Sequence, residues 1–316
     1  MNYYHKLKKS IKGTVRLRES LARHTTFGIG GPAQLLIEPR NLEDIKTILR
    51  FAKHKHVPVR IIGAGSNLLI RDRGVKGITL KLTAPVFRTI GKISKECISV
   101  GSAVTVPQLL AFTKDHLLGG CEFLAGIPGT VGGALAMNAG ICIAKKGIRK
   151  ERSIGDIVTE VSVIEFSGQV KTLQRKAISF LYRDSCLKSC IILSAKLKLF
   201  PKGKARIKRD LTTFITLRRS NQEARMPSAG CVFKNPVVNS AFKWKNRSIS
   251  AGWLIDQCGL KGQRVNDAVV SQKHANYIIN SGNANADDVL KLMRTIQRNV
   301  EKKFGVMLEP EIKIID

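Results

Sequence analysis

The sequence has no long hydrophobic run, and it is poor in aromatic residues. No apolar stretch in its 316 residues approaches the ~20 needed to span a bilayer, so we expect no membrane insertion. Aromatic residues make up only 6%, but hydrophobic residues together reach 43%, which excludes an intrinsically disordered chain. A chain of this length suits two or three domains with ordinary cores.

A secretory signal and a paired cysteine framework are also lacking. The first 20 residues, MNYYHKLKKSIKGTVRLRES, are basic and contain neither an apolar stretch nor a small-residue cleavage site. The seven cysteines are odd in number and include no C-x-x-C pair, which is typical of reduced thiols. Cys186 and Cys190, the nearest two, lack the second pair that a structural zinc site needs. We therefore expect a cytoplasmic protein without a metal.

Acidic residues are too few to balance the basic ones. The 23 Asp and Glu residues face 54 Lys and Arg residues, which leaves a formal net charge of +31. Such a field attracts nucleic acids, anionic lipids or polyanionic small ligands. The basic residues are dispersed, however, and no known nucleic-acid module is present, so we predict solvated basic faces and no specific nucleic-acid partner. The densest run, AKKGIRKER over 144–152, is expected to be a surface loop.

Hydrophobic periodicity predicts a mixture of helices and strands. The pattern indicates a first helix that starts after the N-cap Asn41 and ends before Pro58, with Leu42, Ile45, Ile48, Leu49 and Ala52 on one face. It indicates further helices at 106–118, 202–225, 250–260, and from Asn285 to Gly305. It indicates strands at 59–62, in a hairpin over 157–173 that turns at Ser167-Gly168, in the second half of 182–200, at 275–280 and at 306–315. The sequence therefore predicts an α+β architecture.

Two glycine-rich stretches could bind an anion. Glycine permits positive φ and close approach of a ligand, and consecutive N–H groups can form an anion-binding nest. The first stretch is GAGSNLLI, starting at Gly63, and the second is AGIPGTVGGALAMNAG, starting at Ala125. Neither matches a Walker loop or the G-x-G-x-x-G pattern, and each alone could be a mere turn. Together they suggest a dinucleotide held mainly by backbone groups, for which a flavin fits better than a nucleoside triphosphate.

Three other positions carry chemistry that the local pattern leaves open. Arg183, beside Tyr182, could clamp a carboxylate or phosphate, or form a structural pair with Asp184. Glu311, in the predicted terminal strand, would by itself be a solvent-facing carboxylate. Cys231, in ARMPSAGCVFKNP, would by itself be an inert buried thiol, since free cysteine is among the most buried residue types.

Eight motifs in order give a more specific indication. They are HTTFGIGGPA, GAGSNLLI, GIPGTVGGALAMNAG, YRDS, PSAGCVFKNP, AGWLIDQCGLKG, SQKHANYIIN and LEPEI. From about Leu21 to the C-terminus the chain resembles the UDP-N-acetylenolpyruvoylglucosamine reductase family, and the YRDS to PSAG spacing resembles its shorter type, which lacks an extra substrate-capping loop. The resemblance implies a basic segment over 1–20 and a two-lobed FAD-binding module of the p-cresol methylhydroxylase (vanillyl-alcohol oxidase) type over 21–200, with lobes at about 21–85 and 86–200. It implies a linker helix and a C-terminal α+β substrate-binding domain over 201–316.

The resemblance also implies a reaction. The family reduces the enolpyruvyl ether of UDP-N-acetylglucosamine to UDP-N-acetylmuramate for peptidoglycan synthesis, with non-covalent FAD and with NADPH as co-substrate. Hydride addition to the vinyl carbon leaves negative charge on the adjacent carbon and its carboxylate, which calls for a cation and a proton donor. On the family pattern Arg183 is the cation, Glu311 supports the enolic intermediate, and Cys231 donates the proton where most relatives have serine. We expect a monomer whose partners are the UDP-sugar and NADPH.

Binding residues follow from the same resemblance. It implies FAD contacts at Gly63, Ala64, Gly65, Ser66, Asn67, Leu68, Gly126, Gly129, Thr130, Gly132 and Gly133. It implies substrate contacts at Tyr182, Lys234 and Asn235. Two departures stand out: the segment ICIAKKGIRKERSI is longer and more basic than in relatives, and Asn266-Asp267 replaces the usual Gly-Gly. Asn and Asp tolerate left-handed backbone, so that turn can survive.

Two other functions compete with the reductase. An FAD-dependent carbohydrate or alcohol oxidase of the same superfamily would let oxygen reoxidise the flavin, and such oxidases often tether it covalently. His24 is the only histidine close to a flavin loop that could form such a tether, and the order of YRDS, GCVFKNP and LEPEI argues against an oxidase. A basic nucleic-acid-binding protein is the third hypothesis, supported by the net charge alone.

Overall fold

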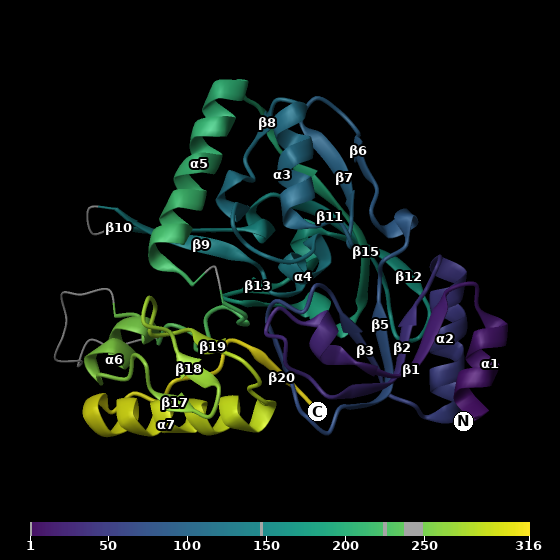
Figure 1. Ribbon diagram of the computed structural model, residues 1–316. Helices are drawn as coiled ribbons and strands as arrows, with labels where there is room; N and C mark the ends of the chain where they lie inside the picture. The colour runs from purple at the N-terminus through teal and green to yellow at the C-terminus, as the bar shows by residue number, and fades with distance from the viewer. Residues whose placement is uncertain (1, 146–147, 224–225, 237–248) are drawn as a thin grey trace. The chain divides into compact units, whose positions relative to one another are not determined.

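The computed structural model describes residues 2–145, 148–223, 226–236 and 249–316. The chain forms two compact units from non-contiguous segments (Figure 1). The first unit comprises Met1–Glu19, Gln34–Ala64 and Lys76–Arg218, and the second comprises Ser20–Ala33, Gly65–Val75 and Arg219–Asp316. The contiguous domain ranges expected from the sequence, 1–20, 21–200 and 201–316, stay a prediction. Within the described ranges, no helix is long and apolar enough to cross a membrane.

One sheet of the first unit has the strand order β1-β2-β5-β3. Its strands are β1 (Thr14–Ser20), β2 (Pro32–Glu38), β3 (Val59–Ile62) and β5 (Val75–Lys81), and β3 pairs with β5 in parallel. Helices α1 (Asn2–Ser10) and α2 (Leu42–Lys55) contribute to the same hydrophobic core as this sheet. The predicted N-cap is confirmed, because the side chain of Asn41 accepts a hydrogen bond from the Asp44 N–H at 3.0 Å.

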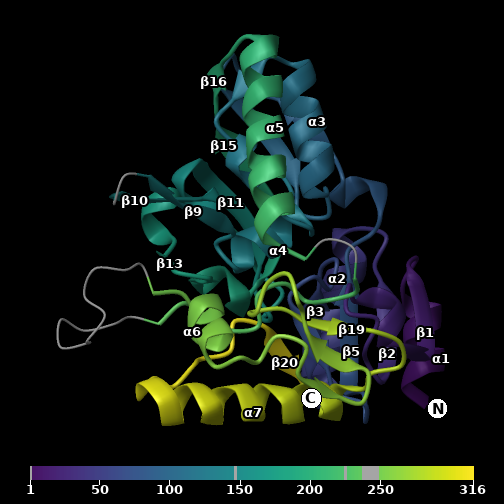
Figure 2. The same cartoon turned by 60° about the vertical axis from the view of Figure 1, so that its left-hand side comes forward.

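A five-stranded sheet with the order β12-β11-β15-β7-β6 forms the rest of the core of the first unit. Its strands are β6 (Ile90–Lys92), β7 (Cys97–Gly101), β11 (Val158–Ile164), β12 (Val170–Gln174) and β15 (Ile191–Lys198). The predicted hairpin is confirmed, with Gly168 at φ +93° in the turn between β11 and β12. Helices α3 (Val106–Asp115) and α5 (Lys204–Asn221) pack on the same core and run near each other in both views (Figures 1 and 2).

Two predictions for this unit are wrong. Helix α3 ends at Asp115 rather than at 118, because Leu117 takes φ +56° and the next residues form β8 (Leu118–Gly119), which pairs with β16 (Phe200–Pro201). The basic run over 144–152 is not a loop. It belongs to β9 (Gly140–Lys145) and β10 (Ile148–Ser153), which pair antiparallel, while residues 146 and 147 lie outside the described ranges. Each of the two strands is an edge strand, and lysine is common on edge strands, so a high density of charge does not exclude a strand.

The second unit is built around a three-stranded sheet in the order β17-β18-β19. Its strands are β17 (Arg264–Val265), β18 (Ala268–Val270) and β19 (Ile278–Asn280), and its helices are α6 (Ala251–Gln257) and α7 (Ala286–Phe304). Helix α7 lies along β17 and β18 (Figure 1), with the predicted apolar stripe in the core. A capping box at Asn285 and a left-handed Gly305 delimit α7, as predicted. Asn266 takes φ +49° between β17 and β18, which confirms that the Asn-Asp pair keeps the turn.

The C-terminal strand is shorter than predicted. Only β20 (Lys313–Ile315) forms, and it pairs in parallel with β4 (Leu68–Ile70). Glu311 therefore precedes the strand, because Pro310 has no N–H to donate and makes only an isolated bridge with Phe233. The strand nevertheless joins the C-terminus to the end of the first glycine-rich stretch.

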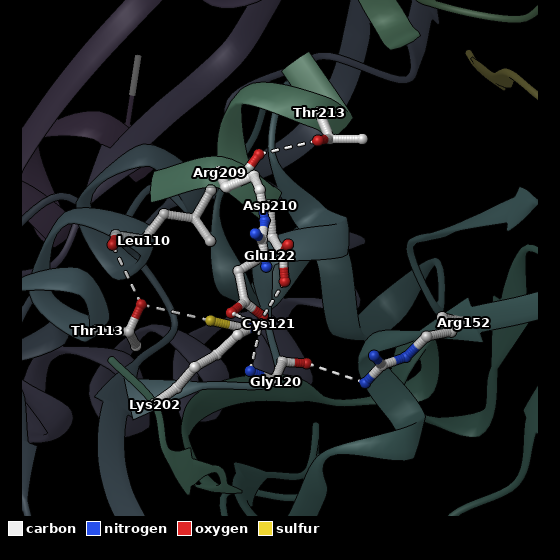
Figure 3. A network of polar contacts seen from close by, with 10 residues as sticks. All are labelled: Leu110, Thr113, Gly120, Cys121, Glu122, Arg152, Lys202, Arg209, Asp210 and Thr213. Atoms are coloured by element: carbon white, nitrogen blue, oxygen red, sulfur yellow. Dashed lines mark hydrogen bonds and ion pairs between the residues drawn. The ribbon is translucent and has the colours of Figure 1, made fainter. Parts of the chain in front are cut away.

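A charged cluster links α5 to the turn after β8 within the first unit (Figure 3). Lys202 Nζ lies 2.7 Å from Glu122 Oε1 and 2.5 Å from Asp210 Oδ2, and the Glu122 side chain is only 6% exposed. Gly120 N–H donates to the other oxygen of Glu122 at 2.7 Å. Burial alone would lower the pKa of Lys202, but its hydrogen bonds to Asp210 and Glu122 outweigh burial and raise that pKa. The cluster is therefore a compensated set of charges.

Replacing Lys202 should destabilise the first unit strongly. Lys202→Met leaves Glu122 buried and unpaired, and removal of one partner of a buried ion pair costs about 3–5 kcal/mol. We expect that loss in urea denaturation followed by circular dichroism. The exposed pair of Lys46 and Glu43, 2.8 Å apart, provides the matched control, because Lys46→Met should cost no more than about 1 kcal/mol. Equal losses in the two variants would contradict the structural role of the cluster.

Candidate active site

The first glycine-rich stretch leaves β3 with Gly63 and Ala64 and enters the second unit at Gly65. Gly65 takes φ +70°, and a Cβ there would lie 2.1 Å from the carbonyl oxygen of His24, so only glycine fits. Thr26 N–H donates to the Gly65 carbonyl at 3.3 Å and holds the turn. No acceptor in the described ranges receives the N–H groups of Ala64 and Gly65. These two donors are therefore not used by the described part of the fold.

The second stretch behaves differently, because part of it forms the short helix α4 (Val131–Ala136). The N-cap Thr130 accepts the Gly133 N–H through Oγ1 at 3.3 Å, and Gly132 N–H donates to the Ser102 carbonyl at 2.8 Å. The anion nest predicted at Gly132 and Gly133 is therefore not available, since the protein itself uses both N–H groups. Across the described chain, no acceptor receives the N–H groups of Gly129 and Thr130, which are the open donors here.

The two stretches meet within the first unit. A Cβ on Gly63 would lie 2.9 Å from Thr130 Oγ1, so the end of β3 approaches the start of α4 closely. Gly132 packs in the same way on Ser102, whose Cβ would be 2.9 Å from an added Cβ. In the first unit the N–H groups of Ala64, Gly129 and Thr130, with no carboxylate in either stretch, fit a phosphate group of the expected FAD. The residues present therefore fit this cofactor.

Arg183 lies at the tip of a small hairpin in the first unit. Strands β13 (Phe180–Leu181) and β14 (Asp184–Ser185) pair antiparallel, so Tyr182 and Arg183 form the turn between them. Arg183 takes φ +55°, which is uncommon for a residue with a side chain and is typical of constrained functional positions. Its guanidinium lies 5.2 Å from the centre of the Tyr182 ring, and its Nη1 donates to the Gly140 carbonyl at 3.3 Å.

Bonds to the C-terminal end of α4 anchor this hairpin. Ser185 Oγ contacts the carbonyl oxygens of Leu135 and Ala136 at 2.9 and 3.0 Å. Asn138 Nδ2 donates to the Leu181 carbonyl at 3.0 Å. Helix α4 therefore carries the glycine stretch at its N-terminal end and the Arg183 hairpin at its C-terminal end. The predicted cation and the predicted cofactor loop share one rigid element.

The segments that carry Cys231 and Glu311 are joined by backbone hydrogen bonds in the second unit. Cys231 is half-buried, follows Gly230 at φ +81°, and pairs with Tyr277 in an isolated bridge. Glu311 N–H donates to the carbonyl of Val232, the residue after Cys231, at 2.7 Å. The two segments, 80 positions apart in the sequence, are thus joined by backbone hydrogen bonds, which include the one from Lys234 N–H to the Glu309 carbonyl at 2.9 Å.

Residues of the first glycine-rich stretch lie beside this pair. Asn67 Nδ2 donates to the Glu311 carbonyl at 3.2 Å, and Lys313 N–H donates to the Asn67 carbonyl at 2.9 Å. Leu68 faces Lys313 in the pairing of β4 with β20. Within the second unit the structure therefore joins the predicted cofactor residue Asn67 to the backbone of the predicted catalytic Glu311.

The predicted substrate residues after Cys231 both have partners in the protein. Lys234 Nζ lies 3.3 Å from Glu309 Oε2 in an exposed ion pair, which is weak and easily exchanged for an anionic ligand. Asn235 Oδ1 accepts the Ala251 N–H at 3.1 Å, in the first turn of α6. The carboxamide oxygen of Asn235 is therefore committed to the fold.

Two residues of the site were not predicted from the sequence. Thr26 joins the first glycine-rich stretch to the Cys231 turn, because its Oγ1 donates to the Ser228 carbonyl at 2.7 Å. Asn276, only 3% exposed, bonds the backbone of Val232 and Phe233. Both belong to motifs that carry the family resemblance, HTTFGIGGPA and SQKHANYIIN. An asparagine inside the apolar segment ANYIIN is the sequence signal that could have singled out Asn276, because a buried polar side chain needs hydrogen-bond partners.

His274 makes the second unit sensitive to acid. Burial lowers the pKa of His274, and its Nδ1 accepts the Asn276 N–H at 3.1 Å. The pKa of His274 in the folded state lies below the unfolded value of about 6.5. The contribution of neutral His274 to the free energy of unfolding is therefore fully present well above pH 6.5, and it is lost as the pH falls from there toward the folded pKa. We expect the melting temperature to fall more between pH 7.5 and 5.5 in the wild type than in His274→Asn, which keeps an acceptor. An equal fall in melting temperature in the two proteins would contradict the role of His274 in this acid sensitivity.

Comparison with known proteins adds to this geometry. Residues 220–315 match a family model described as the C-terminal domain of UDP-N-acetylenolpyruvoylglucosamine reductase, and residues 33–174 match a model described as an FAD binding domain. The chain is 37% identical over 313 residues to the UDP-N-acetylenolpyruvoylglucosamine reductase of Desulforamulus reducens, which covers 98% of this chain and 96% of that relative. It is 40% identical over 304 residues to the UDP-N-acetylenolpyruvoylglucosamine reductase 2 of Symbiobacterium thermophilum. That alignment covers 96% of this chain and 92% of that relative.

A solved structure supports the same relationship. The crystal structure of UDP-N-acetylenolpyruvylglucosamine reductase from Thermus caldophilus matches with a TM-score of 0.77 and 33% identity, over 97% of this chain and all of that one. The match includes segments of both compact units. Together with the FAD-binding model it confirms the predicted fold class, α+β with an FAD-binding module.

Proposed function

The chain belongs to the UDP-N-acetylenolpyruvoylglucosamine reductase family, and on this premise we propose that it reduces UDP-N-acetyl-3-O-(1-carboxyvinyl)-glucosamine to UDP-N-acetylmuramate. NADPH is the proposed reductant, and the product serves peptidoglycan precursor synthesis. The observation that carries the proposal is the pairing of Cys231 with Glu311 through Val232, inside the region that matches the reductase C-terminal model. That backbone bond holds the segment that carries a potential proton donor next to the segment that carries a carboxylate, and protonation of an enolate requires a positioned acid.

The cofactor is held by backbone groups in this proposal. The N–H groups of Ala64, Gly129 and Thr130 in the first unit would hold oxygen atoms of FAD, and the predicted FAD contact of Gly65 would come from the second unit. Bound FAD, once reduced by NADPH, supplies the hydride that adds to the vinyl carbon. Gly63 lets the two stretches approach each other, because any side chain there would meet Thr130. The remaining predicted contacts, including those of Ser66, Leu68, Gly126, Gly132 and Gly133, are proposed as packing against the cofactor.

The proposed roles of the polar side chains follow from the charge that the reaction develops. The guanidinium of Arg183 binds the enolate that forms as the vinyl carbon is reduced, since a bidentate cation matches a carboxylate-like pair of oxygens. Glu311 supports that enolic intermediate through a hydrogen bond. Cys231 then delivers the proton to the carbon next to the reduced vinyl carbon. A cysteine thiol, with an unperturbed pKa of roughly 8.5, is a stronger acid than the serine hydroxyl expected in most relatives.

Substrate binding completes the proposal. Tyr182, next to Arg183 in the turn, provides an aromatic surface and a hydroxyl at the substrate. Lys234 exchanges its exposed pair with Glu309 for an anionic group of the UDP-sugar. We further propose the shorter type of the family, without an extra substrate-capping loop, acting as a monomer in the cytoplasm, with domains near 21–200 and 201–316.

Dependence of NADPH oxidation on the enolpyruvyl sugar nucleotide tests this function. The purified protein should be yellow from bound flavin, and NADPH consumption followed at 340 nm should require the sugar nucleotide under anaerobic conditions. Oxygen consumption without the sugar nucleotide would instead indicate an oxidase. A colourless protein that binds DNA with a steep salt dependence would contradict both enzymatic functions.

A further inference from the structure

The hydrogen bonds of Asn276 converge on the segment that follows Cys231. Phe233 N–H donates to Asn276 Oδ1 at 2.9 Å, and Asn276 Nδ2 donates back to the Phe233 carbonyl at 2.8 Å. Val232 N–H donates to the Asn276 backbone carbonyl at 2.8 Å. One buried residue thus fixes the peptide groups on both sides of Val232, directly beside the candidate proton donor.

The same segment holds Glu311. The carbonyl of Val232 accepts the Glu311 N–H at 2.7 Å, so Val232 is bonded to Asn276 by its N–H and to Glu311 by its carbonyl. The side chains of Val232 and Phe233 are each only 1% exposed, which leaves little room for the segment to move. A displacement of Asn276 would therefore be transmitted to Cys231 and Glu311 together.

Asn276 is itself held by its neighbours. Its N–H donates to His274 Nδ1, and the His274 N–H contacts Ser271 Oγ at 3.4 Å. Ser271 Oγ in turn donates to Glu223 Oε2 at 2.9 Å. Every polar group of Asn276 is engaged in this network. An apolar residue in its place would leave the buried N–H and carbonyl of Phe233 without partners, which costs more than the bonds contribute.

We propose that Asn276 is a positioning residue for this reaction, which directs the Cys231 thiol and places Glu311 through Val232 without touching the substrate. This inference rests on the proposed function, because it assigns proton donation to Cys231. Proton transfer needs the donor within hydrogen-bond reach of its target, and a displacement of about 1 Å can cost about 10²-fold in rate. The role is specific to the step after hydride transfer.

A matched pair of variants tests the proposal. Asn280 is also a buried asparagine of the same motif, but its side chain bonds Phe27, Gly282 and Ala284 rather than the segment after Cys231. Asn276→Ala should lower the rate of flavin reoxidation by the enolpyruvyl sugar nucleotide about 10- to 100-fold, while the rate of flavin reduction by NADPH stays unchanged. Asn280→Ala should lose comparable stability but keep both rates. Equal effects of the two variants on reoxidation would overturn the proposal.

Alkylation of Cys231 provides a readout that does not depend on activity. The rate of reaction of Cys231 with iodoacetamide across pH 7–9, measured by peptide mass spectrometry, should change in Asn276→Ala, while the exposed Cys186 reacts as in the wild type. Unchanged alkylation and reoxidation in a folded Asn276→Ala would overturn the proposal. If Asn276→Ala does not fold, the same two rates are measured in Asn276→Asp, which keeps an oxygen that can accept the Phe233 N–H, and the same outcomes decide. If the wild type does not reduce the sugar nucleotide, the proposed function fails, but the alkylation comparison still decides whether Asn276 positions Cys231.

Discussion

Cys231→Ala should abolish most turnover while leaving flavin reduction by NADPH intact. A positioned general acid contributes about 10²- to 10⁴-fold, so reoxidation of the flavin by the enolpyruvyl sugar nucleotide should slow by that factor. Flavin reduction precedes any need for the proton and should keep its wild-type rate. Stopped-flow absorbance of the flavin separates the two half-reactions.

Two variants control for a structural effect of this change. Cys231→Ser should keep substantial activity, because a hydroxyl occupies the same place and is the residue expected in most relatives. Cys186→Ala removes an exposed thiol of the first unit and should leave both half-reactions unchanged. Iodoacetamide should inactivate the wild type but not Cys231→Ser, since only a thiolate is readily alkylated. Normal turnover by Cys231→Ala would mean that the proton comes from another group.

Arg183→Asn is expected to have the second large effect. Asparagine tolerates the left-handed backbone that Arg183 adopts at φ +55°, so this change removes the guanidinium without forcing the hairpin turn to change. Loss of one electrostatic stabiliser of a developing oxyanion costs about 10²- to 10³-fold in kcat. The substrate carboxylate is already charged before hydride transfer, so KM should rise as well. Steady-state kinetics with the enolpyruvyl sugar nucleotide measures both quantities.

Arg183→Lys distinguishes charge from geometry. Lysine keeps the positive charge but lacks the planar fork that binds two oxygens at once, so this variant should recover part of the loss in kcat and not all of it. The melting temperatures of both variants should stay close to that of the wild type, because the anchoring bonds of Ser185 and Asn138 are not altered. A wild-type kcat in Arg183→Asn would rule out the proposed role at the enolate.

The same geometry explains which parts of the fold were predictable. Helix ends depend on residues within one turn of each other, so the caps at Asn41 and Asn285 and the left-handed Gly305 follow from the sequence alone. The turn at Asn266 was predictable for the same local reason. Strand pairing is not local: the run over 144–152 looked like a loop because its charges are visible in the sequence, whereas its pairing with the residues after Gly140 is not.

For the candidate site, the sequence by itself determined the residue types, through the order of its motifs and the positions of its glycines. Only the tertiary structure decided which backbone groups the fold uses, since the N–H groups of Gly132 and Gly133 bond inside the fold while those of Gly129 and Thr130 bond no acceptor among the described residues. It also decided that the backbone of Glu311 bonds Val232, the residue after Cys231. The physical reason is that a hydrogen bond across 80 residues depends on the packing of a whole unit, which no local pattern records.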